Sequence, residues 1–130
     1  MSQYVESKKR ASGLSPTQLW MLDQACKSLT QAFKHTPFLV GSMLTNSNFR
    51  DVDIRLILPD NEHDAYPFNV LTLMGFLVSE RLTNLTGLNV DFQFQRMTDA
   101  NEKHLGPRNP IGCRSLNNFT GDGRKNIEPI

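Results

Sequence analysis

Three aspartates stand where carboxylate chemistry is expected. Asp51 and Asp53 lie two residues apart in segment 51–58, whose alternation of apolar and polar residues predicts a β-strand. Asp91 falls on the polar side of a second alternating segment, 88–95. A small sheet can therefore bring the three carboxylates together on one face. Such a cluster raises the pKa of its members or binds a cation, and Mg²⁺ prefers oxygen ligands that it often shares with substrate phosphates.

A Gly-Ser pair precedes these aspartates. Gly41 and Ser42 stand at the end of a short apolar run, 37–41, that predicts a buried strand, and residues 42–48 are compatible with one or two helical turns. Glycine lets a phosphate approach the backbone closely, and a helix N-terminus offers unpaired N–H groups. The order predicts a phosphate cradle followed by metal-binding carboxylates. The alternative, in which the acidic residues only solvate a strand face, stays open.

These motifs resemble the signature of the DNA polymerase beta-type nucleotidyltransferase superfamily. That signature is an apolar strand, Gly-Ser, a spacer like the eight residues here, and then Asp-apolar-Asp-apolar, as at 51–54. Asp91, flanked by Val90 and Phe92, matches its third carboxylate on a later strand. The match covers residues 38–95, and the chain is also similar to uncharacterised nucleotidyltransferase-like proteins of phages and bacteria.

The resemblance implies a role for each of these residues. Asp51 and Asp53 would bind two Mg²⁺ ions, or Mn²⁺, and Asp91 would complete the site of the catalytic ion. Gly41 and Ser42 would hold the triphosphate of a nucleoside triphosphate. The implied reaction transfers a nucleoside monophosphate to a hydroxyl of an unknown acceptor, which is a protein, an RNA or a small molecule, and releases pyrophosphate.

Two arginines are candidate phosphate ligands. Arg55 follows the aspartate pair on the same predicted strand face, where it either binds phosphate or neutralises Asp53 in a salt bridge. Arg108 lies in the Gly/Pro-rich segment 106–112, and such a loop with an arginine suits anion binding. The alternative for Arg108 is an exposed side chain on a surface loop.

Helices and strands alternate along residues 15–95. Ser15, Pro16 and Gln18 have the pattern of a capping box, so we expect a helix from Pro16 that ends before Pro37. Residues 59–61 predict a turn. A second helix is expected over 67–85, with an inner stripe at Leu71, Met74, Val78, Leu82 and Leu85.

This order predicts an α/β domain of the α+β type, in which a small mixed β-sheet has helices packed on one face. Residues 1–14 are expected to be flexible, 15–95 to form the nucleotidyltransferase-like core, and 96–130 to be a loop-rich extension of the same domain. The extension is poorer in hydrophobic residues than the preceding part of the chain.

Composition limits the classes of function. The 130 residues carry 14 Lys and Arg against 13 Asp and Glu, a balance that argues against binding to extended duplex nucleic acid. The N-terminus has no apolar core typical of a signal peptide, and no apolar run approaches a membrane span. We therefore expect a cytoplasmic protein without a membrane partner. Cys26 and Cys113 have no paired spacing and are expected as thiols.

Two functions follow from these observations. The first is a magnesium-dependent nucleotidyltransferase of the minimal type. The second is a non-catalytic domain of the same fold that binds a partner protein or a nucleotide. Because a chain of 130 residues offers little surface to enclose a substrate, a homodimer or a protein partner is compatible with either function.

Overall fold

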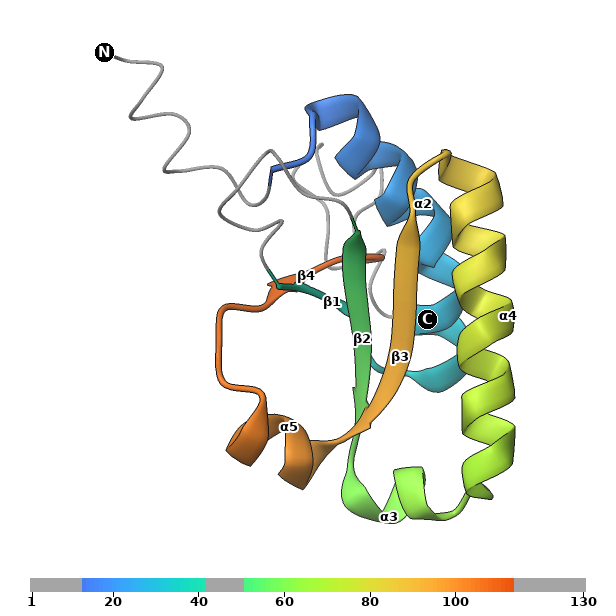
Figure 1. Ribbon diagram of the computed structural model, residues 1–130, viewed down its shortest axis with the longest axis vertical. Helices are drawn as coiled ribbons and strands as arrows, with labels where there is room; N and C mark the ends of the chain where they lie inside the picture. Colours follow the sequence, from blue (N-terminus) through green and yellow to red (C-terminus); the bar gives the residue numbers. More distant parts are fainter. Residues whose placement is uncertain (1–12, 42–50, 114–130) are drawn as a thin grey trace.

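A computed structural model describes residues 13–41 and 51–113 as a four-stranded sheet with helices (Figure 1). The strands are β1 (Phe38–Val40), β2 (Val52–Leu58), β3 (Val90–Arg96) and β4 (Asn109–Pro110), in the order β3-β2-β1-β4. The helices are α2 (Pro16–Phe33), α3 (Asp60–Asp64), α4 (Phe68–Thr86) and α5 (Met97–Lys103).

The sheet is mixed, as the sequence predicts. β1 pairs antiparallel with β2, placing Val40 beside Asp53, and β4 pairs antiparallel with β1. β2 and β3 are parallel because α4 connects them as a crossover, and their register sets Asp53 directly beside Asp91. The α+β class with a small mixed sheet is therefore confirmed.

One face of the sheet carries the core. Val52, Ile54 and Leu56 of β2 and Phe92 of β3 are each no more than 1% exposed, and they cluster with buried side chains of α2 and α4. Figure 1 shows α2 passing behind the β2–β3 pair and α4 running alongside β3. The side chains that alternate with these core residues lie on the opposite face, called here the open face; they include Asp53, Arg55, Asp91 and Gln93.

Helix α2 begins as its sequence predicts. The Ser15 hydroxyl accepts a hydrogen bond from the Gln18 N–H at 3.1 Å, and the Gln18 side chain accepts one from the Ser15 N–H at 2.9 Å. This capping box satisfies backbone donors that a helix start otherwise leaves unpaired. The helix ends at Lys34, which adopts the left-handed conformation with φ of 62°.

Segment 109–112 docks on α2 and β1. The buried Asp23 carboxylate accepts a hydrogen bond from the Gly112 N–H at 2.7 Å. Gly112 has φ of +83°, and a Cβ there would lie 2.9 Å from Cys26. No disulfide joins Cys26 to Cys113, and burial, with the Asp23 charge as a smaller cause, raises the pKa of the Cys26 thiol to about 12. This segment is thus held by the core.

Three details differ from the sequence expectations. Residues 59–61, predicted as a turn, lead into α3, where the Asp60 carboxylate accepts a hydrogen bond from the Thr98 N–H at 3.0 Å. The predicted loop-rich extension contains α5 and β4. Leu85, predicted on the inner stripe of α4, is 48% exposed, whereas Gly75, which was not predicted on that stripe, is buried beside the Phe92 carbonyl of β3.

The predicted flexible segment 1–14 lies outside the described residues except for its last two, of which Leu14 is buried in the core. Ser42 also lies outside the described residues. Within residues 13–41 and 51–113, no helix has the length and apolar character to cross a membrane.

Candidate functional site

Asp53 and Asp91 are neighbours on the open face. They are register partners on the parallel strands β2 and β3, whose backbones run roughly 4.8 Å apart. Asp51, just before β2, is exposed, and its carboxylate accepts a hydrogen bond from the Asn89 side chain. The structure therefore brings two of the three predicted carboxylates side by side and sets the third at the entrance of β2.

Gly41 touches Asp53. Its φ is +88°, and a Cβ added there would lie 2.5 Å from the Asp53 Oδ2 atom. Any other residue would strain the backbone and collide with this carboxylate. The expected proximity of the Gly-Ser pair and the aspartate pair is thus observed for Gly41.

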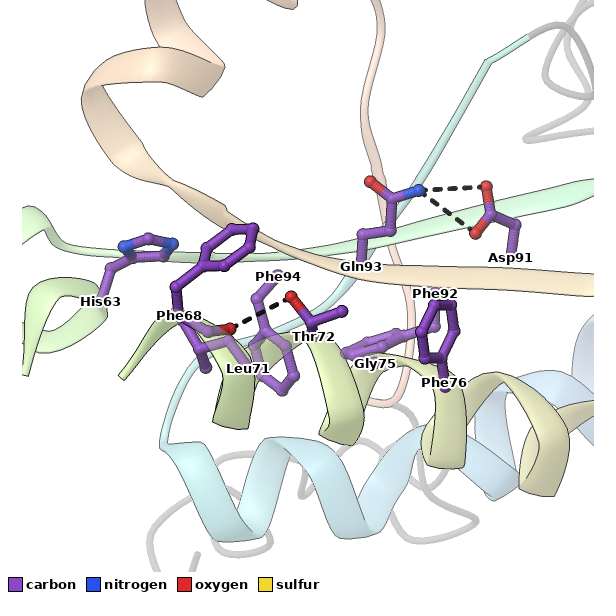
Figure 2. Close-up of a pocket in the computed structure, with 10 residues that line it drawn as sticks. All are labelled: His63, Phe68, Leu71, Thr72, Gly75, Phe76, Asp91, Phe92, Gln93 and Phe94. Atoms are coloured by element: carbon purple, nitrogen blue, oxygen red, sulfur yellow. Dashed lines mark hydrogen bonds between the residues drawn. The ribbon is translucent and has the colours of Figure 1, made fainter. Parts of the chain in front are cut away.

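Arg55 pairs with Asp91 and not with Asp53. Its guanidinium donates to the backbone carbonyls of Ile54 at 2.9 Å and Asp91 at 2.8 Å, and it lies 3.4 Å from the Asp91 Oδ2 atom. Only 13% of the Arg55 side chain is exposed. The Gln93 side chain also donates to both Asp91 oxygens, as Figure 2 shows. The predicted salt bridge of Arg55 with Asp53 is therefore not formed, and Asp91 is the partner of this arginine instead.

Asp53 is the carboxylate left available. No hydrogen bond to its side chain is found in the part of the chain that the structure describes, whereas Asp51 and Asp91 each accept at least one. Burial raises the pKa of Asp53, Arg55 opposes this shift, and the charges of Asp91 and Asp51 add to it. An anionic Asp53 therefore lacks compensation that a cation would supply.

The resemblance implies that the three aspartates hold two magnesium ions. Among the described residues, no group of three or more His, Cys, Asp and Glu side chains is arranged to hold a metal ion. Asp91 and Asp51 already accept hydrogen bonds from Arg55, Gln93 and Asn89. Mg²⁺ is commonly held by one or two carboxylates together with substrate phosphates, and Asp53 suits that arrangement. Among the described residues, the three aspartates are thus not gathered into one group for the two ions that the resemblance implies.

A groove of about 650 Å³ lies over these residues. Gly41, Asp53 and Arg55 form part of its floor, and α5 with the loop after it forms a wall. Arg108 lines this wall, where it donates to the Ala100 carbonyl at 2.8 Å and to the Asn101 side chain at 3.2 Å. The structure thus brings Arg108 to the same groove as Asp53, as the sequence predicts for a loop that serves the site.

Several groove residues are not evident from the sequence. Arg96 lines the groove and is paired with Asp60 at 3.4 Å and Asp64 at 3.1 Å, both on α3. His63 and His104 line it as well. The signal for Arg96 in the sequence is its position at the end of an alternating segment, whereas its partners Asp60 and Asp64 lie more than 30 residues earlier in the chain.

Comparison of the chain with models of protein families, with curated proteins and with solved structures finds no match.

Proposed function

We propose that this chain is a nucleotidyltransferase-like domain whose open-face groove binds a nucleoside triphosphate together with one Mg²⁺ ion. The observation that carries the proposal is the placement of Gly41 against the Asp53 carboxylate, which has no hydrogen bond among the described residues. Gly41 and Asp53 are two of the motif elements on which the resemblance rests. The groove volume of about 650 Å³ lies in the range of small-molecule sites.

Asp53 is the residue proposed to hold the ion. When bound, Mg²⁺ supplies positive charge that joins this carboxylate to the phosphate oxygens. Arg108 lines the same groove, and the N–H groups that it does not donate to Ala100 and Asn101 would supply a second contact for phosphate. The cost of placing Asp53 beside Asp91 is offset when the ion binds.

Binding without transfer is the function that this geometry favours. Nucleotidyl transfer in the family pattern needs the third carboxylate for the catalytic ion. Here Arg55, largely buried, occupies Asp91 together with Gln93. Arg55 donates to two backbone carbonyls of the sheet as well as to Asp91, so moving it away would break all three contacts together. The contact is therefore expected to persist when a nucleotide binds.

Magnesium-dependent nucleotidyl transfer is the second candidate, favoured by the register that sets Asp53 beside Asp91. A nucleoside triphosphate labelled at the α-phosphate distinguishes the two. Transfer attaches the label to an acceptor in a lysate and releases pyrophosphate, whereas binding alone leaves the nucleotide intact. The acceptor would be a protein, an RNA or a small molecule.

Isothermal calorimetry tests the proposal directly. Each of the four common nucleoside triphosphates is titrated into the wild type, Asp53→Ala and Glu80→Ala, with Mg²⁺ and with EDTA. Glu80 is an exposed carboxylate of α4 outside the groove, and its variant is the matched control. We expect Mg²⁺-dependent binding that Asp53→Ala removes and Glu80→Ala retains. Equal binding by Asp53→Ala and the wild type would refute the role of Asp53.

A further inference from the structure

A second cavity opens beside Asp91, between α4 and the outer edge of β3. It has a volume of about 270 Å³ and is walled by Phe68, Thr72, Gly75 and Phe76 of α4 and by Phe92 and Phe94 of β3 (Figure 2). Asp91, Gln93 and His63 also line it. The cavity is therefore apolar inside and polar where it meets the candidate site.

Two phenylalanines of this cavity are unusually exposed. Phe68 is 78% exposed and Phe76 is 69% exposed, although both are large apolar side chains. Figure 2 shows Phe68 near His63 at one end of the cavity and Phe76 near Phe92 at the other. Exposed aromatic rings beside a cavity indicate a binding site, because they present flat faces on which a planar ligand can stack.

The edge of β3 offers a hydrogen-bonding pair in the same cavity. The parallel register directs the backbone groups of Val90, Phe92 and Phe94 away from β2. Hydroxyls of α4 satisfy the first two, since the N–H of Val90 donates to Thr83 at 3.0 Å and that of Phe92 to Ser79 at 2.8 Å. Within residues 13–41 and 51–113, nothing hydrogen-bonds the outward N–H and C=O of Phe94.

This open edge is too short for a peptide strand. Ser79 and Thr83 close it on one side of Phe94. On the other side β3 ends at Arg96, because α5 begins at Met97. At Phe94 one donor and one acceptor remain, which suits the edge of a planar heterocycle rather than an added strand that would need several such pairs.

The cavity adjoins the open-face groove. His63, Phe68, Gln93 and Phe94 line both. A ligand can therefore have its planar part in the apolar cavity and its charged part in the groove. At about 270 Å³ the cavity holds a ring system and not a whole nucleotide.

We propose that this cavity binds the nucleobase, with Phe68 and Phe76 in contact with the ring and the backbone N–H and C=O of Phe94 hydrogen-bonded to its edge. The proposal rests on the proposed nucleotide-binding function and adds the part of the chain that recognises the base. A base stacked on an aromatic side chain loses about 10- to 100-fold in affinity when that side chain is removed.

The test compares a whole nucleotide with ligands that contain only its triphosphate or only its nucleoside. The four common nucleoside triphosphates, inorganic triphosphate and the four nucleosides are titrated into the wild type, Phe76→Ala, Phe76→Tyr and Leu73→Ala. Leu73 is 57% exposed on the same helix and does not line the cavity, so its variant is the matched control. Calorimetry gives the affinities, and the amide signal of Phe94 in ¹H–¹⁵N spectra reports occupation of the cavity.

We expect at least one nucleoside triphosphate to bind more tightly than inorganic triphosphate. That advantage falls about 10- to 100-fold in Phe76→Ala and persists in Phe76→Tyr and Leu73→Ala. Equal affinity for inorganic triphosphate and every nucleoside triphosphate overturns the base pocket while leaving phosphate binding intact. Nucleosides that shift the Phe94 amide when no triphosphate binds support the pocket and refute the proposed function. No shift of Phe94 by any ligand overturns the pocket.

Discussion

The two faces of the β2–β3 pair differ in the interactions that define them: apolar packing on one face and individual hydrogen bonds on the other. On the core face, Ile54 and Phe92 are no more than 1% exposed, and their contribution depends on apolar area and volume. On the open face, Asp53 and Asp91 are equivalent in sequence pattern, yet Asp91 is held by Arg55 and Gln93 and Asp53 is not. Alternation along the sequence therefore determines which face a residue occupies, whereas individual hydrogen bonds determine which carboxylate is available to bind a ligand.

A second pair of carboxylates makes the same point. Asp23 on α2 is 1% exposed and accepts the Gly112 N–H, so its role is to hold segment 109–112. Asp53 faces a groove and has no such donor among the described residues. A buried, satisfied carboxylate supports the fold, and an unsatisfied one beside a groove is a candidate ligand.

The largest effect is expected on the core face. Phe92→Ala should lower the free energy of unfolding by about 3–5 kcal/mol, because it leaves a cavity between β3 and the helices. Gln93→Ala, one residue later on the open face, should change it by no more than about 0.5 kcal/mol. Denaturant titration of both variants measures the contrast. Similar losses in the two would mean that the faces are not distinct.

Alanine substitutions at two glycines with positive φ distinguish the cost of backbone strain from the cost of a collision with Asp53. Gly41→Ala and Gly87→Ala should each cost about 1–2 kcal/mol for the left-handed conformation. Gly41→Ala should cost more and should abolish nucleotide binding, because its Cβ displaces Asp53, whereas nothing lies within 4 Å of a Cβ at Gly87. Denaturant titration and calorimetry check both statements. Unimpaired binding by Gly41→Ala would contradict the contact.

Arg55 is expected to contribute to stability as well as to block Asp91. Arg55→Ala removes donors from the Ile54 and Asp91 carbonyls and should cost about 1–3 kcal/mol. Arg55→Lys keeps the charge but not the planar fork that reaches two carbonyls, so it should restore stability only in part. Thermal denaturation compares the three proteins, and full restoration by lysine would show that charge alone matters.

The smallest effect concerns pH. Burial and neighbouring carboxylates raise the pKa of Asp53 in the folded state above its ordinary value of 3.8. Folding therefore favours the protonated form, and the ionised form lowers stability at pH 7. Asp53→Asn should raise the Tm slightly at pH 7 in EDTA, and the gain should disappear as the pH falls below 3.8. A gain that persists at lower pH would have another cause.

Most of the fold was predictable because it depends on local patterns. The Ser15–Gln18 capping box and the alternation of β2 depend on residues close in sequence, and the structure has both. Each end of α4 was predicted to within one residue. The contact of Gly75 with β3 was not predicted, because a glycine has no side chain to mark it as part of an apolar stripe.

The candidate site was predictable only in part. The strand positions of Asp53 and Asp91 followed from alternation, but their different availability depends on which oxygens Arg55 reaches across the sheet. The exposed rings of Phe68 and Phe76 could not be anticipated either, because an apolar helix residue is ordinarily assigned to the core. Such contacts join residues distant in sequence and require the fold to be known.

The most direct test of the central claim is a map of where the nucleotide binds. A ¹⁵N-labelled sample of the full chain is titrated with ATP and Mg²⁺, and amide shifts are followed residue by residue. The account predicts shifts at Gly41, Asp53, Gln93 and Gly106, around the groove, and none at Cys26 on α2. Shifts confined to α2, or none with any of the four nucleoside triphosphates, would contradict it.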